Sequence, residues 1–199
     1  IELEFVRKDG SVMPVNLHTS VLHNSKGEFI RTRSIVIDLT ERKQAEEKLA
    51  KIVDSVNIPA FAINSEHKIT HWNTAVESLT GVKREEVIGS DKQWIAFYAT
   101  KRPVMADLIV DELPESKIKD WYVDKYKKSS LIEGAYEAVD FFPTLGEEGK
   151  WLLFTAAPLR DSEGTIIGAI ETLQDITERK RAEDELRNAN KQLRDTIEF

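Results

Sequence analysis

The feature that most constrains the fold is an internal repeat. The segment from Ser20 to Leu49 aligns without gaps on the segment from Ala157 to Leu186, an offset of 137 residues with 12 identities in 30 positions. A match of this kind means that one structural unit occurs twice. In each copy an apolar, strand-like run leads into Asp-Leu-Thr-Glu-Arg-Lys or Asp-Ile-Thr-Glu-Arg-Lys, at residues 38–43 and 175–180, and a charged run follows. The chain therefore contains the same strand-to-helix junction twice.

Each junction carries residues suited to starting a helix. A side-chain oxygen at the N-cap accepts an amide hydrogen of the first turn, and a glutamate three residues later completes a capping box. The threonine two residues after the aspartate is an alternative cap. The predicted sets are Asp38, Glu41 and Thr40 in the first copy, and Asp175, Glu178 and Thr177 in the second.

The helices predicted after the junctions each carry a narrow apolar stripe. Its residues recur at spacings of four, three and four, which is typical of a coiled-coil seam. Each stripe covers barely two heptads, so an amphipathic helix that packs on its own domain is the alternative. We interpret the stripes as surfaces that pair with a second chain. They consist of Ala45, Leu49, Ile52 and Val56, and of Ala182, Leu186, Ala189 and Leu193.

Strand patterns precede both junctions. Alternating apolar residues at 1–7, 11–22 and 28–37 are separated by turns, and the pattern recurs at 135–142, 150–159 and 165–173. Only the second unit has a front half. It contains strands at 60–64 and 68–72, a short helix that starts at Asn73 or Thr74 and ends at Gly81, another that ends at Gly89, a helix opened by Pro103, and a helix from Ser116 that carries Tyr126. This order indicates an α+β fold.

That order, together with Asn73-Thr74-Ala75, Leu79-Thr80-Gly81, Glu85-Glu86-Val87-Ile88-Gly89 and Asp175-Ile176-Thr177-Glu178-Arg179, resembles the PAS family of bacterial and archaeal signalling proteins. The resemblance covers nearly the whole chain, as a tandem PAS/PAC segment. It implies the PAS fold, a five-stranded antiparallel sheet with helices on one face, here flanked by coiled-coil-like helices. The implied segments are the last strands of a truncated first PAS domain (1–40), a connecting signalling helix (41–57), a complete second PAS domain (58–177) and an outgoing signalling helix (178–199).

The resemblance also implies a relay. In the family, the Asp-Ile-Thr element passes a change in the sheet to the outgoing helix, and its aspartate pairs with a nearby basic residue. The matching positions are Asp175, Thr177 and Arg179 in the second copy and Asp38, Thr40 and Arg42 in the first. The expected pairs are Asp175 with Arg179 and Asp38 with Arg42, and helix capping alone is the alternative role.

A ligand pocket is a further implication. Six of the sixteen aromatic residues lie between Trp94 and Tyr126, in the region that walls the family's pocket, where haem, flavin, a carboxylic acid or nothing is held. Lys101 and Arg102 precede the Pro103 helix and can hold an anion. A larger hydrophobic core is the alternative interpretation. The candidate pocket residues are Trp94, Phe97, Tyr98, Arg102, Met105, Trp121, Tyr122 and Tyr126.

The residue types present exclude several kinds of site. The chain has no cysteine, which excludes a cysteine-linked flavin. Its histidines, His18, His23, His67 and His71, lie outside the segment that supplies the family's haem ligand, which argues against haem. No nucleotide-binding motif or metal-ligand cluster occurs, so we assign no catalytic residue and no metal, and the cofactor stays unknown.

Charge and hydropathy indicate the surroundings of the chain. A net charge of −7 without a basic run argues against nucleic-acid binding, and no apolar run is long enough to span a bilayer. We therefore expect a cytoplasmic segment without membrane contact, cut from a longer protein that is anchored elsewhere or not at all. The expected partners are a second copy, bound through the helices and sheet, a small-molecule ligand, and a downstream effector, either a histidine kinase or a diguanylate cyclase. The expected function is a sensory module that binds a small molecule or senses a cytoplasmic cue and relays it through the Asp-Ile-Thr junction to the outgoing helix. The alternative function is a ligand-free dimerisation and relay module.

Overall fold

The computed structural model describes residues 1–123 and 125–197, without the side chains of residues 49 and 195–197. The chain divides into two compact units, Ile1–Ile52 and Val53–Phe199, and each is described by itself.

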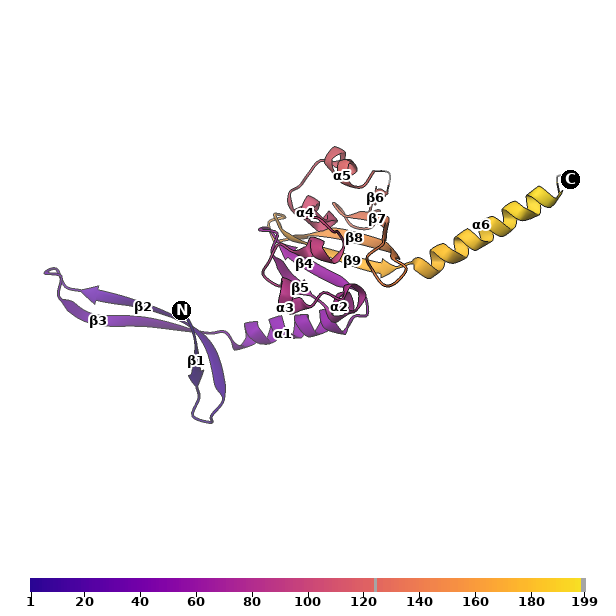
Figure 1. The fold of residues 1–199 in the computed structure, drawn as a ribbon. Helices are drawn as coiled ribbons and strands as arrows, with labels where there is room; N and C mark the ends of the chain where they lie inside the picture. The colour runs from indigo at the N-terminus through magenta and orange to yellow at the C-terminus, as the bar shows by residue number, and fades with distance from the viewer. Residues whose placement is uncertain (124, 198–199) are drawn as a thin grey trace. The chain divides into compact units, whose positions relative to one another are not determined.

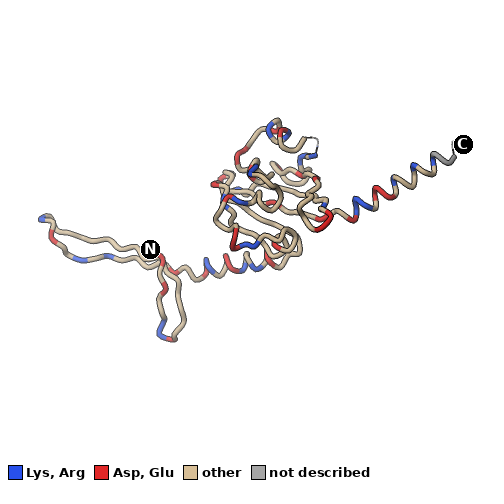
Figure 2. Tube along the Cα trace, in the orientation of Figure 1, with Lys and Arg blue, Asp and Glu red and all other residues tan. Residues whose placement is uncertain are grey.

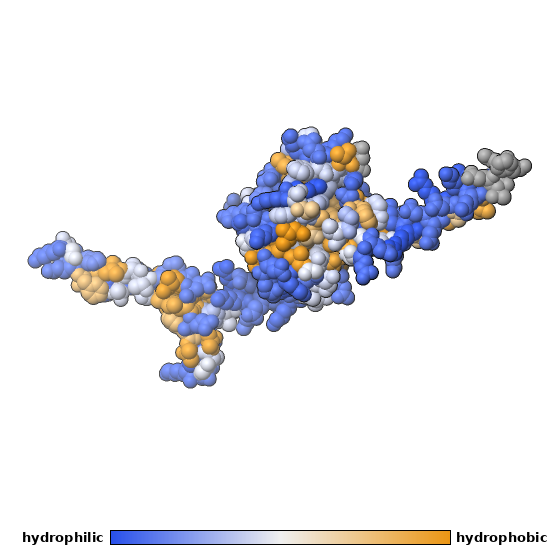
Figure 3. Space-filling view, in the orientation of Figure 1, coloured by the Kyte–Doolittle hydropathy of each residue, from blue (hydrophilic) through white to orange (hydrophobic). Residues whose placement is uncertain are grey.

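The first unit is a three-stranded antiparallel sheet, in the order β1-β2-β3. Its strands are β1 (Glu2–Val6), β2 (Val12–His23) and β3 (Phe29–Asp38), as the alternating pattern predicts. Helix α1 (Thr40–Ser55) follows. Val15 and Leu39 are buried, but the apolar residues of β3 are exposed, and Figure 3 shows hydrophobic surface along these strands.

The second unit is built on a six-stranded antiparallel sheet, in the order β5-β4-β9-β8-β7-β6 (Figure 1). The strands are β4 (Ala60–Asn64), β5 (Ile69–Trp72), β6 (Tyr126–Lys128), β7 (Tyr136–Phe142), β8 (Lys150–Arg160) and β9 (Ile166–Asp175). Alternate residues of the central strand β9, including Ala169 and Leu173, are buried, because they face the helices. The expected α+β architecture is confirmed.

The strand β6 corrects two predictions, because we expected five strands and placed Tyr126 on a helix. The preceding helix α5 ends at Trp121, and Tyr126 instead pairs with Ala138 of β7. The strand is held by a ring contact between Tyr126 and Tyr136, with 6.0 Å between centroids, and by a 3.0 Å ion pair between Lys127 and Glu137 on the two strands. Such pairing across strands is not visible in the local sequence.

Five short helical segments lie between β5 and β6: α2 (Thr74–Thr80), α3 (Arg84–Val87), the 3-10 helix η1 (Gln93–Ala96), α4 (Met105–Val110) and α5 (Glu115–Trp121). Helix α2 begins at its cap Asn73, whose side chain accepts the Val76 N–H, and ends at Gly81, whose positive φ of 77° suits glycine. Helix α4 packs on β4, β8 and β9, and its Met105 and Leu108 are buried in the core.

The outgoing helix α6 (Thr177–Ile197) is exposed over residues 181–194, and Figure 2 shows charges of both signs on it. Its predicted stripe residues Leu186 and Leu193 are 64% and 61% exposed. In α1, Ile52 is 50% exposed, and the side chain of Leu49 lies outside the described residues. Of the helices in the described part of the chain, none has the length and apolar character needed to cross a membrane.

Candidate functional site

The second repeat junction joins the sheet to α6 through a dense set of hydrogen bonds, which we call the outgoing joint. The Ile176 N–H donates to the Trp151 carbonyl at 2.8 Å, and the Ile176 side chain is buried. The Asp175 carboxylate accepts the Thr177 N–H at 2.9 Å and the Thr177 hydroxyl at 2.6 Å. In turn, Thr177 Oγ1 accepts the Trp151 N–H at 3.0 Å. The first turn of α6 is therefore bonded directly to the start of β8.

The charge partner of Asp175 corrects the expected pairing with Arg179. Lys150 Nζ lies 2.5 Å from Asp175 Oδ2, whereas Arg179 Nε lies 3.7 Å from Glu183 on the next helical turn. Burial raises the pKa of Asp175, but the hydrogen bonds from Lys150 and Thr177 outweigh it and hold that pKa below its usual value. The aspartate precedes the helix, so its carboxylate reaches back to the strand. The joint is held by the contacts of Asp175 with Lys150 and Thr177 in place of the predicted capping box with Glu178.

The first copy departs from the expectation in the same way. Asp38 pairs with Arg7 at 3.2 Å, and Arg42 pairs with Glu46, one turn along its own helix, at 2.8 Å. The Thr40 N–H donates to Asp38 Oδ1 at 2.8 Å, as a helix start requires. The expected partner Arg42 is wrong because it points along the helix surface, where residues four apart meet.

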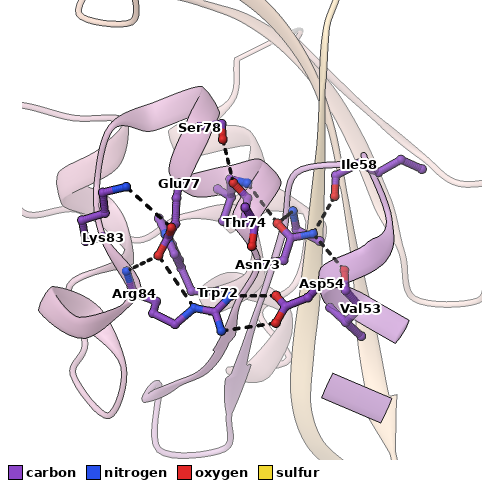
Figure 4. Close-up of polar contacts among 12 residues, drawn as sticks. Val53, Asp54, Ile58, Trp72, Asn73, Thr74, Glu77, Ser78, Lys83 and Arg84 are labelled. Atoms are coloured by element: carbon purple, nitrogen blue, oxygen red, sulfur yellow. Dashed lines mark hydrogen bonds and ion pairs between the residues drawn. The ribbon is translucent and has the colours of Figure 1, made fainter. Parts of the chain in front are cut away.

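At the other end of the complete unit, Asn73 ties the last turn of α1 to the start of β4 and α2, an arrangement we call the incoming joint (Figure 4). Asn73 is 1% exposed. Its Oδ1 accepts the N–H groups of Ala60 at 3.0 Å and Val76 at 2.9 Å, and its Nδ2 donates to the carbonyls of Ile58 at 2.8 Å and Val53 at 3.3 Å. A carboxamide supplies both donors and acceptors, so every hydrogen-bonding group of this buried side chain is used.

An ion-pair cluster completes the incoming joint. Arg84 Nη2 and Nη1 donate to the two oxygens of Asp54, at 2.7 and 3.3 Å, and the Arg84 N–H donates to Glu77 at 2.8 Å (Figure 4). Lys83 Nζ lies 3.7 Å from the same glutamate. The Asp54 and Arg84 side chains are 35% and 36% exposed, so the pair contributes about 1 kcal/mol or less. The main effect of the Asp54–Arg84 pair is on geometry, because a bidentate ion pair fixes the orientation of the end of α1.

The predicted pocket residues lie in or beside the core. Phe97, Met105 and Tyr122 are buried, Trp94, Tyr98, Arg102 and Tyr126 are partly buried, and Trp121 is exposed. A row of aromatic rings fills the interior between helices and sheet. Successive ring centroids in this row lie 5.7 to 6.1 Å apart, in the order Phe61, Phe97, Phe142, Phe154 and Tyr122. This packing corresponds to the larger hydrophobic core that was the alternative interpretation.

Arg102 lies among three of the predicted aromatic residues. Its guanidinium carbon is 4.1 Å from the Tyr98 ring centroid, 5.0 Å from that of Trp121 and 5.2 Å from that of Tyr122. Such contacts stabilise the cation through the negative faces of the rings. Trp94 lines a surface cleft of about 400 Å³ together with Arg102, whereas Tyr126 belongs to the sheet edge.

Glu171, a carboxyl in the interior, was not identified from the sequence. It lies on β9, is 3% exposed and accepts the Ala106 N–H of α4 at 2.9 Å. Burial raises its pKa to about 8, and the nearby Asp107 adds to the effect. The group is therefore mostly protonated at neutral pH and can both donate and accept a hydrogen bond. A single charged residue on the inward alternation of an apolar strand was the available signal.

Several joint residues were also missed. Asp54 and Arg84 are 30 residues apart in sequence, and Lys150 and Asp175 are 25 apart, so neither pair leaves a local pattern. Only Asn73 had a signal, as a possible helix start.

Three comparisons place the chain among known proteins. A family model described as "PAS domain" matches residues 1–41 and 58–178. Sporulation kinase C of Bacillus subtilis (strain 168) is 28% identical over 153 residues, 76% of this chain and 31% of the kinase. The probable diguanylate cyclase DgcE of Escherichia coli (strain K12) is 23% identical over 190 residues, 91% of this chain and 16% of the cyclase. The chain thus spans less than a third of the length of either relative.

A solved structure shares the fold. An RNA-binding light-oxygen-voltage receptor superposes with a TM-score of 0.51 at 15% identity, over 89% of this chain and 43% of that one.

Proposed function

Because the chain belongs to the PAS domain family of sensory domains, we propose that its complete unit is a relay in which the outgoing joint passes a change in the sheet to α6. The observation that carries the proposal is the hydrogen bond from the Trp151 N–H to Thr177 Oγ1, because it joins a strand of the sheet to the first turn of the helix. The same threonine hydroxyl donates to Asp175, which binds Lys150 on that strand. A shift of β8 against β9 therefore changes the bonds that start the helix.

The hydrogen bonds of the outgoing joint depend on one another. Lys150 and the Thr177 N–H hold the Asp175 carboxylate that orients the Thr177 hydroxyl, and the oriented hydroxyl leaves its lone pair for the Trp151 N–H. Charge-assisted hydrogen bonds of this type are stronger than neutral ones, so the joint links the sheet firmly to the helix.

We propose a histidine kinase as the effector that α6 addresses, with a diguanylate cyclase as the second candidate. The names of the two curated relatives support these classes. The exposed stripe of Ala182, Leu186, Ala189 and Leu193 supports pairing of α6 with that of a second copy. We also propose a cytoplasmic location, on the charge and hydropathy of the sequence.

The test is Asp175→Ala. The change removes the acceptor of the Thr177 N–H and hydroxyl, a loss of about 1 to 2 kcal/mol at the helix start. We expect faster amide hydrogen exchange in the first turn of α6, unchanged protection in β8 and β9, and loss of regulated effector output in the longer protein.

The matched control is Asp184→Ala, which removes an exposed carboxylate from the same helix. It should leave both readouts unchanged. If Asp175→Ala behaves like this control, the joint only begins a helix and the relay proposal fails.

A ligand-sensing function is the second candidate, favoured by two polar groups in the interior. Glu171 is buried and mostly protonated at neutral pH, and the Tyr122 hydroxyl is buried beside Tyr98. A small molecule with a donor and an acceptor can bind both groups after rearrangement of the rings. Native mass spectrometry of the purified chain tests this, because extra mass that disappears on denaturation indicates a retained ligand, and a bare mass favours the ligand-free relay.

A further inference from the structure

His67 lies between Asp107 of α4 and Asp111, the C-cap of that helix, although it belongs to the turn between β4 and β5. Its Nδ1 is 2.8 Å from Asp107 Oδ1, and its Nε2 is 3.0 Å from Asp111 Oδ1. The histidine and Asp107 side chains are 31% and 9% exposed, whereas Asp111 is 48% exposed. These two contacts connect the turn to a helix some 40 residues later.

The geometry is specific for one protonation state. A neutral imidazole has a single N–H, so it can donate to only one of the two carboxylates, and its other nitrogen would direct a lone pair at an oxygen about 3 Å away. The imidazolium ion donates to both. The observed arrangement therefore fits the cation, which bridges Asp107 and Asp111.

The backbone supports a specific role for this side chain. His67 has φ of 60°, in the left-handed region that non-glycine residues rarely adopt. The turn is closed by Asn64 Oδ1, which accepts the N–H groups of Glu66 at 3.0 Å and Lys68 at 2.9 Å. Glycine would fit this position without strain, so a histidine here has to be held by what its side chain contacts.

The bridged aspartate connects the histidine to the central strand. Asp107 also accepts the Gln93 amide at 2.6 Å and the Val104 N–H at 2.9 Å, and so fixes the start of α4. From the adjacent residue on that helix, the Ala106 N–H donates to Glu171 of β9. A loss of charge at His67 thus acts on the helix that covers the middle of the sheet.

The other charged groups around the cleft do not replace these partners. Asp91 pairs with Lys101 at 2.8 Å, Arg102 lies against aromatic rings, and Glu66 and Lys68 flank the histidine in sequence. Burial lowers the pKa of His67, but hydrogen bonds and charge from Asp107 and Asp111 outweigh it and raise that pKa above its usual 6.5.

We propose that His67 is a pH-responsive clamp, which holds the β4–β5 turn to α4 as an imidazolium and releases it on deprotonation. The clamp provides an input to the module and does not depend on the outgoing joint being a relay. Because the folded pKa is raised, its contribution is complete below the unfolded pKa of about 6.5 and is lost as the pH rises through the folded value.

The experiment is an NMR titration of the whole chain, with the imidazole signals and the α4 amides followed together. We expect His67 to titrate above 6.5. Corrected for intrinsic exchange rates, protection of the Ala106 to Leu108 amides should fall about two- to fivefold as it titrates, the size that a partly exposed ion pair gives. The titrations are run in the Glu171→Gln background, because Glu171 accepts the Ala106 N–H and its pKa of about 8 lies in the same pH range. In that background His67→Asn, which tolerates the left-handed backbone but carries no charge, should abolish the step.

Two further variants keep the test decisive. Asp111→Asn should lower the pKa of His67 without touching the Gln93 and Val104 contacts of Asp107. His71→Asn alters an exposed histidine that contacts the Thr70 hydroxyl, and should leave the step intact. A His67 that titrates at or below 6.5, a pKa unchanged in Asp111→Asn, or the same step in His67→Asn would each overturn the clamp.

Discussion

The two repeat junctions share their strand register and differ in what the neighbouring strand offers the helix. Asp38 pairs with Val15 in the first unit as Asp175 pairs with Leu152 in the second, at the same offset of 137 residues. In both, the residue after the aspartate donates its N–H across the sheet, from Leu39 to the Pro14 carbonyl at 2.9 Å and from Ile176 to the Trp151 carbonyl at 2.8 Å. Pro14 and Trp151 are thus equivalent positions.

The difference between Pro14 and Trp151 at this position changes the connection between strand and helix. Trp151 donates its N–H to Thr177 Oγ1, whereas Pro14 has no N–H to give. The equivalent Thr40 Oγ1 is buried and receives no N–H from Pro14. The first junction therefore begins a helix without bonding it to the strand through its threonine.

The counter-charge differs as well. Lys150 holds Asp175 in the second unit, but its equivalent in the first is Met13, and Asp38 pairs with Arg7 from the turn after β1 instead. The two nearly identical motifs thus share the bond from the threonine N–H to the aspartate, while the facing strand decides how firmly the helix start is coupled to the sheet. We take the second junction as the tighter coupling of the two.

The largest difference between the two units lies at one equivalent position of β3 and β9. The buried Glu171 corresponds to Ser34, an exposed residue of the first unit whose hydroxyl lies 2.9 Å from that of Thr19. The same position in the repeat is thus an exposed hydroxyl in one unit, and a buried carboxyl in the other.

The largest expected effect tests that contrast through pH. The folded pKa of Glu171 is about 8 against an ordinary 4.5, so the free energy of unfolding should fall as the pH rises from 4.5 to 8 and level off above. Each pH unit in that interval costs up to about 1.4 kcal/mol. Denaturant titrations at several pH values measure the slope.

The control is Glu171→Gln, which keeps an acceptor for the Ala106 N–H and cannot ionise, so it should flatten the curve. The variant and its parent are compared in the His67→Asn background, because deprotonation of that histidine lowers stability in the same direction. Parallel curves for the two proteins would show that the carboxyl is ionised or hydrated in the folded chain.

A smaller effect is expected from giving the second junction the residue of the first. Trp151→Pro removes the donor to Thr177 and the ring contact with Phe141, whose centroid lies 5.4 Å away, at a cost of about 2 to 4 kcal/mol. Amide exchange in the first turn of α6 should accelerate more than this global loss accounts for. Trp151→Phe retains the N–H and an aromatic ring, and should keep that turn protected.

The reverse exchange gives the smallest effect. Pro14→Ala restores an N–H opposite the buried Thr40 Oγ1, and the new hydrogen bond contributes about 1 kcal/mol, partly offset by the greater freedom of the unfolded chain. Global stability should barely change, but the first turn of α1 should exchange its amides several-fold more slowly. Unaltered exchange would mean that water already satisfies the threonine.

Much of the architecture was predictable from local patterns. The hairpins of the first unit, the paired strands on both sides of the helices, and the ends of α2 at Asn73 and Gly81 follow from alternation, turn residues and caps. The strand β6 was missed because a three-residue edge strand leaves no periodicity, and its Tyr126 fits a helical pattern as well as a strand. The predicted pocket residues lie partly in the core and partly on its surface, and the sequence did not indicate the contacts of Arg102 with three of their rings.

The sequence by itself determined the repeat, the order of strands and helices, and the two helix starts, because each depends on residues a few positions apart. The tertiary structure alone decided that Asp175 binds Lys150, that Arg84 binds Asp54, and that His67 lies between an aspartate of α4 and the aspartate that caps its end. These contacts join residues 25 to 44 positions apart, brought together only when strands pair and helices pack. Charge complementarity at such distances has many possible partners in a chain with 63 charged residues, and packing selects one.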